Sequence, residues 1–263
     1  MSATSSEEKR PFMEPLIKEN DALRARLEEQ ETTQKFFWDL LVEIARRMQL
    51  SSTSIKVAVS SLLSNEIFWD PVNQHEFFET INNSANVISD SVVLLSLAFR
   101  AKANKLVLKM DPQILQEILA TIQRNAQARL KNVKIALELS SSNQTVKVDY
   151  EYTSIALVYL LDIISEYCED HVIRIVANEK EGNWYLDFKG AKREILMLIY
   201  GMQHYQINQI SENGLNIPPE KILGLHIACE ICRLQQLSTT IIEDNDRFIL
   251  RLIIPGSPGE SNL

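Results

Sequence analysis

The sequence predicts an α+β fold in which long helices precede an α/β sandwich, and two periodicities carry this prediction. Apolar residues follow a heptad from Leu16 to Met48 and a repeat of three and four from Phe78 to Leu95, whereas short alternating segments begin near Lys105. The 263 residues are 45% hydrophobic and 24% charged, as in ordinary soluble domains. The net charge of -8 argues against a nucleic-acid-binding protein, which needs a basic face.

The N-terminal region is expected to be a disordered tail over residues 1–12, which are polar, followed by a coiled-coil helix over residues 13–35. The heptad contains Asn and Gln, and such polar positions can fix the register of a parallel partner helix. A long helix packed against its own domain is the alternative. Because little apolar chain lies nearby before residue 36, the coiled coil is favoured. The a positions are Leu16, Leu23, Gln30, Phe37 and Ile44, and the d positions are Asn20, Leu27, Gln34, Leu41 and Met48.

A helical hairpin is predicted over residues 36–104. The loop between its two helices ends at Pro71, a residue type that interrupts helices. One hairpin alone would expose a large apolar surface, so two chains are expected to combine into a four-helix bundle. The sequence therefore predicts a homodimer, or a heterodimer with a related bundle. The apolar residues of the second helix are Phe78, Ile81, Ala85, Ile88, Val92 and Leu95.

An α/β sandwich is predicted over residues 105–256, before a short tail over residues 257–263. Short apolar or alternating segments predict its strands, and prolines at positions 112 and 218 suit helix N-termini. Helices on one side of a mixed sheet give this architecture. The expected order is strand 106–110, helix 112–130, strands 133–139 and 146–148, helix 152–167, strands 172–177 and 184–188, helix 218–234, and strands 238–242 and 248–254.

One stretch of the first helix matches a known family pattern without a gap. Residues 43–56 read EIARRMQLSSTSIK, against E-L-A-H-E-L-R-T-P-L-T-S-I-K in sensor histidine kinases. Residues 148–151 and 160–168 look like the V-D-P-D and L-L-D-N-A-I-K-Y-S segments of that family. From about residue 35 to residue 255, the chain thus resembles the cytoplasmic core of a histidine kinase. The resemblance implies a dimerisation and phosphotransfer hairpin, followed by an α/β sandwich of the ATPase type shared with gyrase and Hsp90.

The residues that carry kinase chemistry in that family are replaced in this chain. Arg46 falls at the phosphorylated histidine, and a guanidinium does not accept a phosphoryl group. Ile163 falls at the asparagine that coordinates Mg²⁺, and its side chain offers no oxygen ligand. Glu166 replaces a nearby lysine and would repel a triphosphate. Because phosphoryl transfer depends on positioning and on cancelling phosphate charge, the kinase activity is expected to be absent.

The two glycine boxes of the family are also incomplete. Where the first should read D-x-G-x-G, Gly190 replaces the aspartate, and a lysine and a glutamate replace the glycines. Asp187 is the only nearby acid that could replace the aspartate of the box. Because side chains alternate along a strand, Asp187 points to the opposite side from Leu186 and Phe188. In the second box Ile222 replaces one glycine, and Gly224 remains, for which a role in helix packing is expected. Residues 197–216 take the place of the ATP lid and suggest an apolar plug with Tyr200, Met202, Tyr205 and Ile207.

The histidines and cysteines offer no replacement chemistry. The four histidines lie outside the middle of the first bundle helix, so packing or surface roles are expected; they are His75, His171, His204 and His226. Cys229 and Cys232 form a C-x-x-C inside a helix, instead of at a helix N-terminus, where the dipole would lower a thiol pKa. With Cys168 as the remaining cysteine, two small buried residues are favoured over a zinc or redox site.

The sequence therefore predicts a catalytically inactive, histidine-kinase-like dimeric scaffold in two-component-type signalling. No catalytic residue, metal or cofactor is expected, and the partner is expected to be a response-regulator receiver domain or a sensor kinase. Arg46 and Arg47 could complement the acidic pocket of a receiver domain, although a solvated helix face is the simpler explanation. The residues predicted at the dimer or partner interface are Leu23, Leu27, Phe37, Leu41, Ile44, Arg46, Arg47, Ile81, Ile88 and Leu95.

The sequence leaves other functions open and gives a weaker indication of the cellular location. A nucleotide- or small-ligand-binding sensor and a residual histidine kinase or ATPase stay open as alternatives. No run approaches the roughly 20 uninterrupted apolar residues of a membrane span, and the N-terminus has no apolar core behind a basic start. The sequence therefore predicts a cytoplasmic protein.

Overall fold

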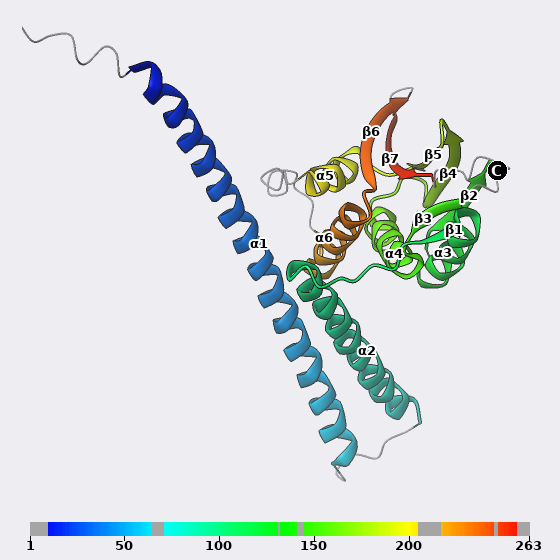
Figure 1. Cartoon of the computed structure of the whole chain (residues 1–263). Coiled ribbons are helices and arrows are strands. Elements are labelled where there is room, and N and C mark those ends of the chain that lie inside the picture. Colours follow the sequence, from blue (N-terminus) through cyan, green and yellow to red (C-terminus); the bar gives the residue numbers. More distant parts are fainter. Residues whose placement is uncertain are drawn as a thin grey trace, which may run out of the picture.

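Two long antiparallel helices and a mixed β-sheet with helices on one face make up the computed structural model (Figure 1). It describes residues 10–64, 71–130, 132–140, 145–204, 217–244 and 247–256. The elements are α1 (Arg10–Leu63), α2 (Pro71–Lys102), β1 (Asp111–Ile114), α3 (Leu115–Arg129), β2 (Lys134–Leu139), β3 (Thr145–Val148), α4 (Tyr150–Glu166), β4 (Val172–Lys180), β5 (Asn183–Lys189), α5 (Arg193–Gln203), α6 (Pro219–Leu234), β6 (Ser238–Asp244) and β7 (Arg247–Pro255). The fold is α+β, as predicted.

The apolar repeat of α1 has different surroundings along the helix. Its first part extends away from the other elements, and there Leu23 and Leu27 are more than half exposed (Figure 1). Farther along, Phe37, Leu41 and Ile44 are buried where α1 packs on α2 and α6. These three residues lie in the chain's own core, so they have no apolar area left for a second subunit. The helix begins at Arg10, inside the segment expected to be a tail, and residues 1–9 lie outside the described part.

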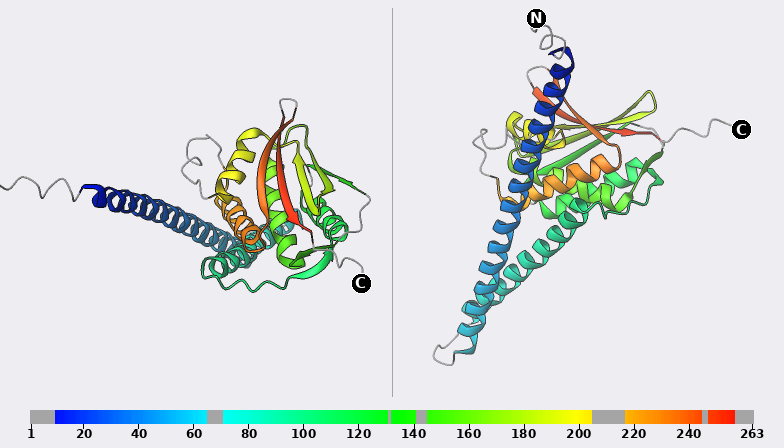
Figure 2. Two further views of the ribbon diagram at one scale, coloured as in Figure 1. Left: turned by 45° about the horizontal axis from the view of Figure 1, so that its top comes forward. Right: turned by 60° about the vertical axis from the view of Figure 1, so that its left-hand side comes forward.

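The sheet has the strand order β2-β4-β5-β7-β6. Strand β2 is parallel to β4, and the other neighbouring pairs are antiparallel. Helices α3, α4 and α6 cover one face of the sheet (Figure 2). A two-residue turn joins β4 to β5, and both of its residues, Glu181 and Gly182, have positive φ, as the tight turns of twisted hairpins require. Strands β1 and β3 form a separate antiparallel pair.

Strand alternation divides the large sheet into a helix-facing side and an outer side. In β5, Trp184, Leu186 and Phe188 are at most 1% exposed and face the core. Asp187 of the same strand lies on the outer side. On the helical side, Asp149 is the N-cap of α4, and its carboxylate accepts the Tyr152 N–H at 2.9 Å. The core places α4 and α6 side by side.

Two segments differ from the elements expected from sequence. Residues 106–110 form no strand, and Pro112 lies in β1 instead of opening a helix, because α3 begins at Leu115. Since β1 belongs to a two-stranded sheet, the missing N–H of a proline is tolerated there. The first residues of the expected lid belong to α5, where Met202 is buried. Tyr205 and Ile207, the rest of the expected plug, lie outside the described residues.

Among the described residues, one helical segment, Gln74–Lys102, has the length and composition of a membrane span, with a mean hydropathy of 1.2. Polar residues interrupt its apolar residues, so the sequence alone did not suggest a span. A bundle helix of a water-exposed protein has the same composition, because its apolar stripe faces other helices. Helix α2 packs along α1 and also contacts α6, and 28% of the apolar window is buried.

Candidate functional site

The position that resembles the phosphorylated histidine lies on the exposed side of α1. Arg46 there is bound to Glu43, one turn earlier, by two hydrogen bonds, of which that from Nε to Oε2 measures 2.9 Å. The pair lowers the pKa of the Glu43 carboxyl and raises the pKa of the guanidinium. Because both side chains reach solvent, the pair is easily separated. Arg46 therefore presents a positive charge on this face of the helix.

The neighbouring Arg47 is turned to the sandwich. Its guanidinium forms an ion pair with Glu220 in the first turn of α6. The second carboxylate oxygen of Glu220 is buried and has no hydrogen-bond partner among the described residues. The two arginines, suggested from sequence as a joint partner site, thus have different surroundings. Arg46 faces solvent, whereas Arg47 links the hairpin to the sandwich.

A cavity of about 290 Å³ lies between the hairpin and the sandwich, beside this ion pair. Burial raises the pKa of the Tyr159 phenol on its wall. Three basic and three acidic side chains line the cavity, so it lacks the excess of positive charge and hydrogen-bond donors that a phosphate needs. The charged residues are Arg47, Arg129, Lys221, Asp90, Asp162 and Glu220.

Helices α4 and α6 meet through ion pairs at the positions that resemble ligands of Mg²⁺ and phosphate. Ile163 of α4 has no exposed surface and packs in the core. Glu166, one turn later, lies 2.5 Å from Nζ of Lys221 on α6, and the Asp162 carboxylate lies 3.5 Å from the same atom. The lysine side chain is only 16% exposed. Two carboxylates of this chain therefore already surround the one ammonium that α6 directs to this place.

The loop after β5 occupies the position of the first glycine box. Gly190 has φ +96°, and a Cβ on it would lie 2.4 Å from the carbonyl oxygen of Val172. Its own carbonyl accepts the Glu169 N–H at 2.7 Å, which ties the loop to the end of α4. Asp187 forms two hydrogen bonds of 2.6 and 2.7 Å with Arg251 on the outer side of the sheet. It therefore does not replace the missing aspartate of the box.

The second glycine box lies inside a helix. Ile222 and Gly224 belong to α6, and the Ile222 N–H already donates to the Pro218 carbonyl at 3.2 Å. A phosphate-binding loop needs free backbone N–H groups, which a helix interior lacks. A Cβ on Gly224 would lie 3.0 Å from Cδ1 of Tyr159 on α4. Gly224 thus allows the two helices to approach, as expected from sequence.

The histidines and cysteines described below lie in packed or surface positions. His226 packs on Phe37 with ring centroids 5.7 Å apart, and burial lowers its pKa. His75 is exposed beside Glu79 in the first turns of α2. Cys229 and Cys232 are buried, and burial raises both thiol pKa values, that of Cys232 to about 12. The described residues include no group of three His, Cys, Asp or Glu side chains arranged to hold a metal.

Three residues of this region were missed by sequence reasoning. Lys221, Glu220 and Arg129 reach the junction only because α6 packs on the hairpin and α3 ends near it. A signal for Lys221 did exist, since Asp162 and Glu166 are four residues apart and place two carboxylates on one face of a helix. Their cationic partner lies on another helix, so the sequence did not identify it.

Comparisons with known proteins agree with the fold. No family model and no curated protein matches the chain. Among solved structures, it is similar to the histidine kinase AdeS of Acinetobacter baumannii, with 16% identity, a TM-score of 0.55, and coverage of 79% of this chain and 95% of AdeS. Full-length ShkA in complex with AMPPNP gives 14% identity and 0.55, over 83% of this chain and 47% of ShkA.

A third structure, the histidine kinase ThkA in complex with the response regulator protein TrrA, gives 13% identity and a TM-score of 0.55, over 91% of this chain and 67% of ThkA. At such identities the likeness concerns the fold alone, because one fold hosts many functions. The chain has the fold of a histidine-kinase core, a helical hairpin followed by an ATPase-type α/β sandwich.

Proposed function

We propose that the chain is a catalytically inactive, histidine-kinase-like regulator that acts by binding proteins in two-component-type signalling. The observation that carries this proposal is the ion pairing of Lys221 with Glu166 and Asp162 between α4 and α6. A triphosphate between α4 and α6 would be repelled by the carboxylates of Glu166 and Asp162. The ammonium of Lys221 already pairs with both carboxylates and is therefore not available to a phosphate. The buried Ile163 beside them offers no ligand for Mg²⁺. Both features argue against nucleotide hydrolysis, and Arg46 argues against a phosphorylated hairpin.

A response-regulator receiver domain is the partner we propose. The similar ThkA structure is a complex with a response regulator protein. In this chain, Arg46 lies exposed on α1, and its bond to the exposed Glu43 is weak enough to be exchanged for a partner carboxylate. A receiver domain with an acidic pocket would match this charge. Arg47 contributes less to the binding of a receiver domain, because its guanidinium is already paired with Glu220.

Calorimetry with ATP, with and without Mg²⁺, tests the loss of nucleotide binding. We expect no heat of binding and no thermal stabilisation at millimolar nucleotide. Binding at about 10 µM, or roughly -7 kcal/mol, together with transfer of a labelled γ-phosphoryl group to the chain, would contradict the proposal.

Arg46→Glu tests the partner site. We expect the variant to lose at least about tenfold in affinity for a panel of purified receiver domains, measured by surface binding, since a repulsive charge replaces an attractive one. Arg124→Glu, an equal charge change on the exposed side of α3, is the matched control and should bind like the original chain. Equal binding of both variants would rule out this site.

A further inference from the structure

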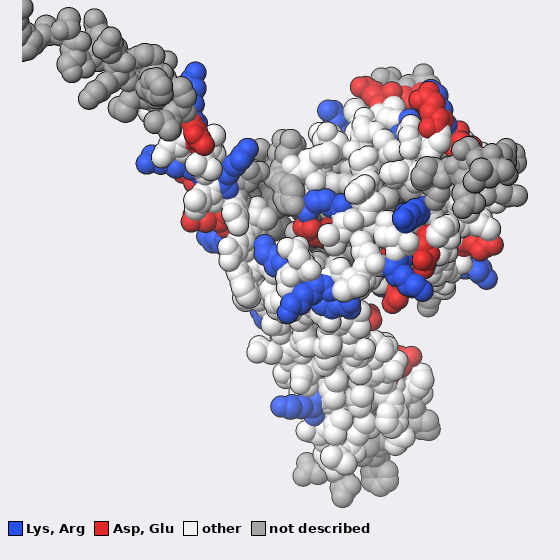
Figure 3. All heavy atoms as spheres, in the orientation of Figure 1, with Lys and Arg blue, Asp and Glu red and all other residues white. Residues whose placement is uncertain are grey.

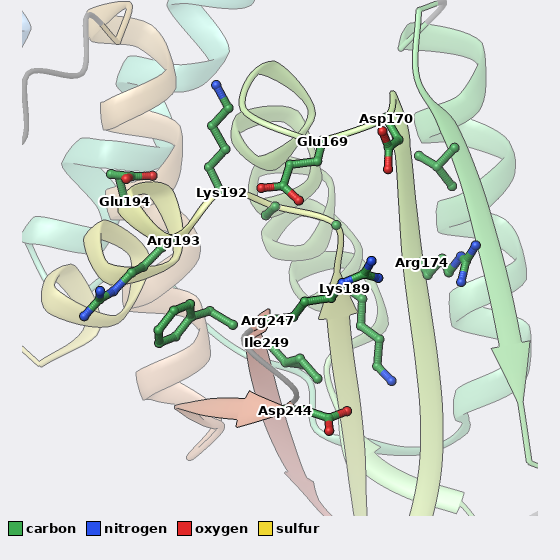
Figure 4. A pocket seen from close by; sticks show the side chains of 14 residues that line it. Glu169, Asp170, Arg174, Lys189, Lys192, Arg193, Glu194, Asp244, Arg247 and Ile249 are labelled. Carbon is green, nitrogen blue, oxygen red and sulfur yellow. The ribbon is translucent and has the colours of Figure 1, made fainter.

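A second, larger cleft lies at one end of the sheet, away from the junction between hairpin and sandwich. Its volume is about 880 Å³, and the ends of β4, β5 and β7 and the loop before α5 line it (Figure 4). Within β4, Ile173 and Ile175 face the core, so Val172 and Arg174 belong to the outer side. The cleft therefore opens on the face of the sheet opposite to α4 and α6. Residues 190–194, the loop at the position of the first glycine box, form part of its wall, and the proposed function does not use the cleft.

Three basic side chains without a partner in the described part of the chain line this cleft. Arg174 of β4 and Lys189 of β5 are directly opposed in the strand register, and Arg247 joins them from the start of β7 (Figure 4). Like charges directly opposite each other destabilise a sheet. None of the three side chains forms a hydrogen bond or ion pair with another residue in the described part of the chain. The whole lining contains five basic and four acidic side chains, and this small positive excess in a chain of net charge -8 favours an anionic ligand.

The backbone holds this arrangement in place. Lys189 is followed by Gly190, whose φ of +96° and contact with the Val172 carbonyl leave no room for a side chain. The next residues are fixed as well, because the Lys192 N–H donates to the Tyr167 carbonyl at 2.9 Å. Lys192 also lines the cleft. The basic groups therefore stand on paired strands and a tied loop, which is how a binding site is preorganised.

The remaining lining residues narrow the class of ligand. Glu169 and Asp170 lie on the loop at one side of the basic group, and Asp244 lies at the other (Figure 4). Such carboxylates accept hydrogen bonds from hydroxyl or amino groups. The guanidinium of Arg193 covers the Phe248 ring at 4.5 Å, so that face of the ring is not free to stack on a base. A small, polar, non-aromatic molecule fits these features.

We propose that this cleft binds a small polyanion through phosphoryl or carboxylate groups held by Arg174, Lys189 and Arg247. The planar guanidinium groups suit two oxygens of one such group, and the ammonium supplies a point charge. The proposal does not depend on the partner or on the inactivity of the chain. The cleft and the ion pairs between α4 and α6 lie on opposite faces of the sheet, so variants separate the two.

Calorimetry with inorganic pyrophosphate and with citrate tests the proposal on the full chain. Pyrophosphate carries phosphoryl groups and citrate carries carboxylates, so the pair distinguishes the two sources of negative charge. We expect at least one of them to bind, more weakly as salt concentration rises, because the cleft is open to solvent. The variant Arg174→Gln with Lys189→Gln should bind at least about tenfold more weakly, or roughly 1.4 kcal/mol. If ATP gives heat that this variant loses, the heat belongs to the cleft and not to α4 and α6.

The matched control is Lys105→Gln with Lys147→Gln, which removes the same charge from exposed positions outside the cleft. This control should bind like the original chain, and both double variants should keep its thermal stability within a few degrees. No binding of either anion at 10 mM would overturn the proposal, as would equal loss of affinity in both double variants.

Discussion

Gly190 links the strand β5 to the loop that replaces the first glycine box. Its positive φ and its 2.4 Å approach to the Val172 carbonyl both exclude a side chain. We expect Gly190→Ala to lower the free energy of unfolding by about 1–3 kcal/mol, since strained backbone and a clash add together. Denaturant unfolding measures this. Gly182→Asn is the control, because Gly182 also has positive φ but open space around it, and Asn tolerates that conformation. Equal losses in both variants would contradict this account.

Cys229 and Cys232 provide a pH-dependent prediction. Burial raises both thiol pKa values, so neither thiol ionises near neutral pH in the folded chain. A thiol reagent at pH 8 should modify the half-buried Cys168 first and the other two only after unfolding. Above about pH 8.5 the unfolded chain releases these protons and the folded chain keeps them. The free energy of unfolding therefore falls as pH rises through this range. Fast native modification of all three cysteines would contradict this.

At the scale of helices, α4 and α6 are coupled by Lys221. Its ammonium is largely buried between Glu166 and Asp162, so Lys221→Gln leaves two carboxylates without their cation. We expect a loss of about 1–3 kcal/mol in the free energy of unfolding. Glu166 is 38% exposed, so its single change should matter less. A double-mutant cycle of Lys221→Gln with Glu166→Gln should give a coupling of about 0.5 kcal/mol or more. If the losses of the two single variants simply add up in the double variant, the ion pair contributes nothing to the free energy of unfolding.

Helices α2 and α4 show what sequence patterns predict well. The spacing of apolar residues located α2, and the run Tyr152–Tyr167 located α4 within two residues, because helix periodicity is a local property. The strand expected over 106–110 did not form, although Leu106 is buried. The backbone N–H of Lys109 is taken by the Asp149 carboxylate at 2.6 Å instead of by a neighbouring strand. Such a long-range bond is not visible in a local pattern.

At the scale of the molecule, the hairpin leaves an apolar stripe without a partner in the chain. Phe78, Val92 and Phe99 of α2 are about half exposed, and with Ala85 they recur every seven residues. Few charged side chains lie on the face of the hairpin that is visible in Figure 3. A heptad stripe of this kind is typical of helices that pack in a bundle. We therefore place the proposed dimer interface on this stripe of α2, beside the half-buried Ile81, Ile88 and Leu95.

Val92→Glu tests this interface. A charge in the middle of the stripe should convert a dimer to a monomer, measured by light scattering of the chain separated by size. Val107→Glu is the control, since Val107 is 81% exposed on the segment between hairpin and sandwich. We expect the control to keep the mass of the original chain. A monomeric original chain, or a dimer unaffected by Val92→Glu, would count against the stripe.

The sequence by itself determined the class of the fold and the residue types at the positions that resemble the kinase motifs. Periodicity follows from the local geometry of helices and strands, and the identities of Arg46 and Ile163 fix which reactions their side chains support. Tertiary structure alone decided which charged side chains of different elements lie together. Register opposed Arg174 to Lys189, and packing brought Lys221 to Glu166. These contacts join residues that lie far apart along the chain, so their strength depends on distance and burial, which no local pattern contains.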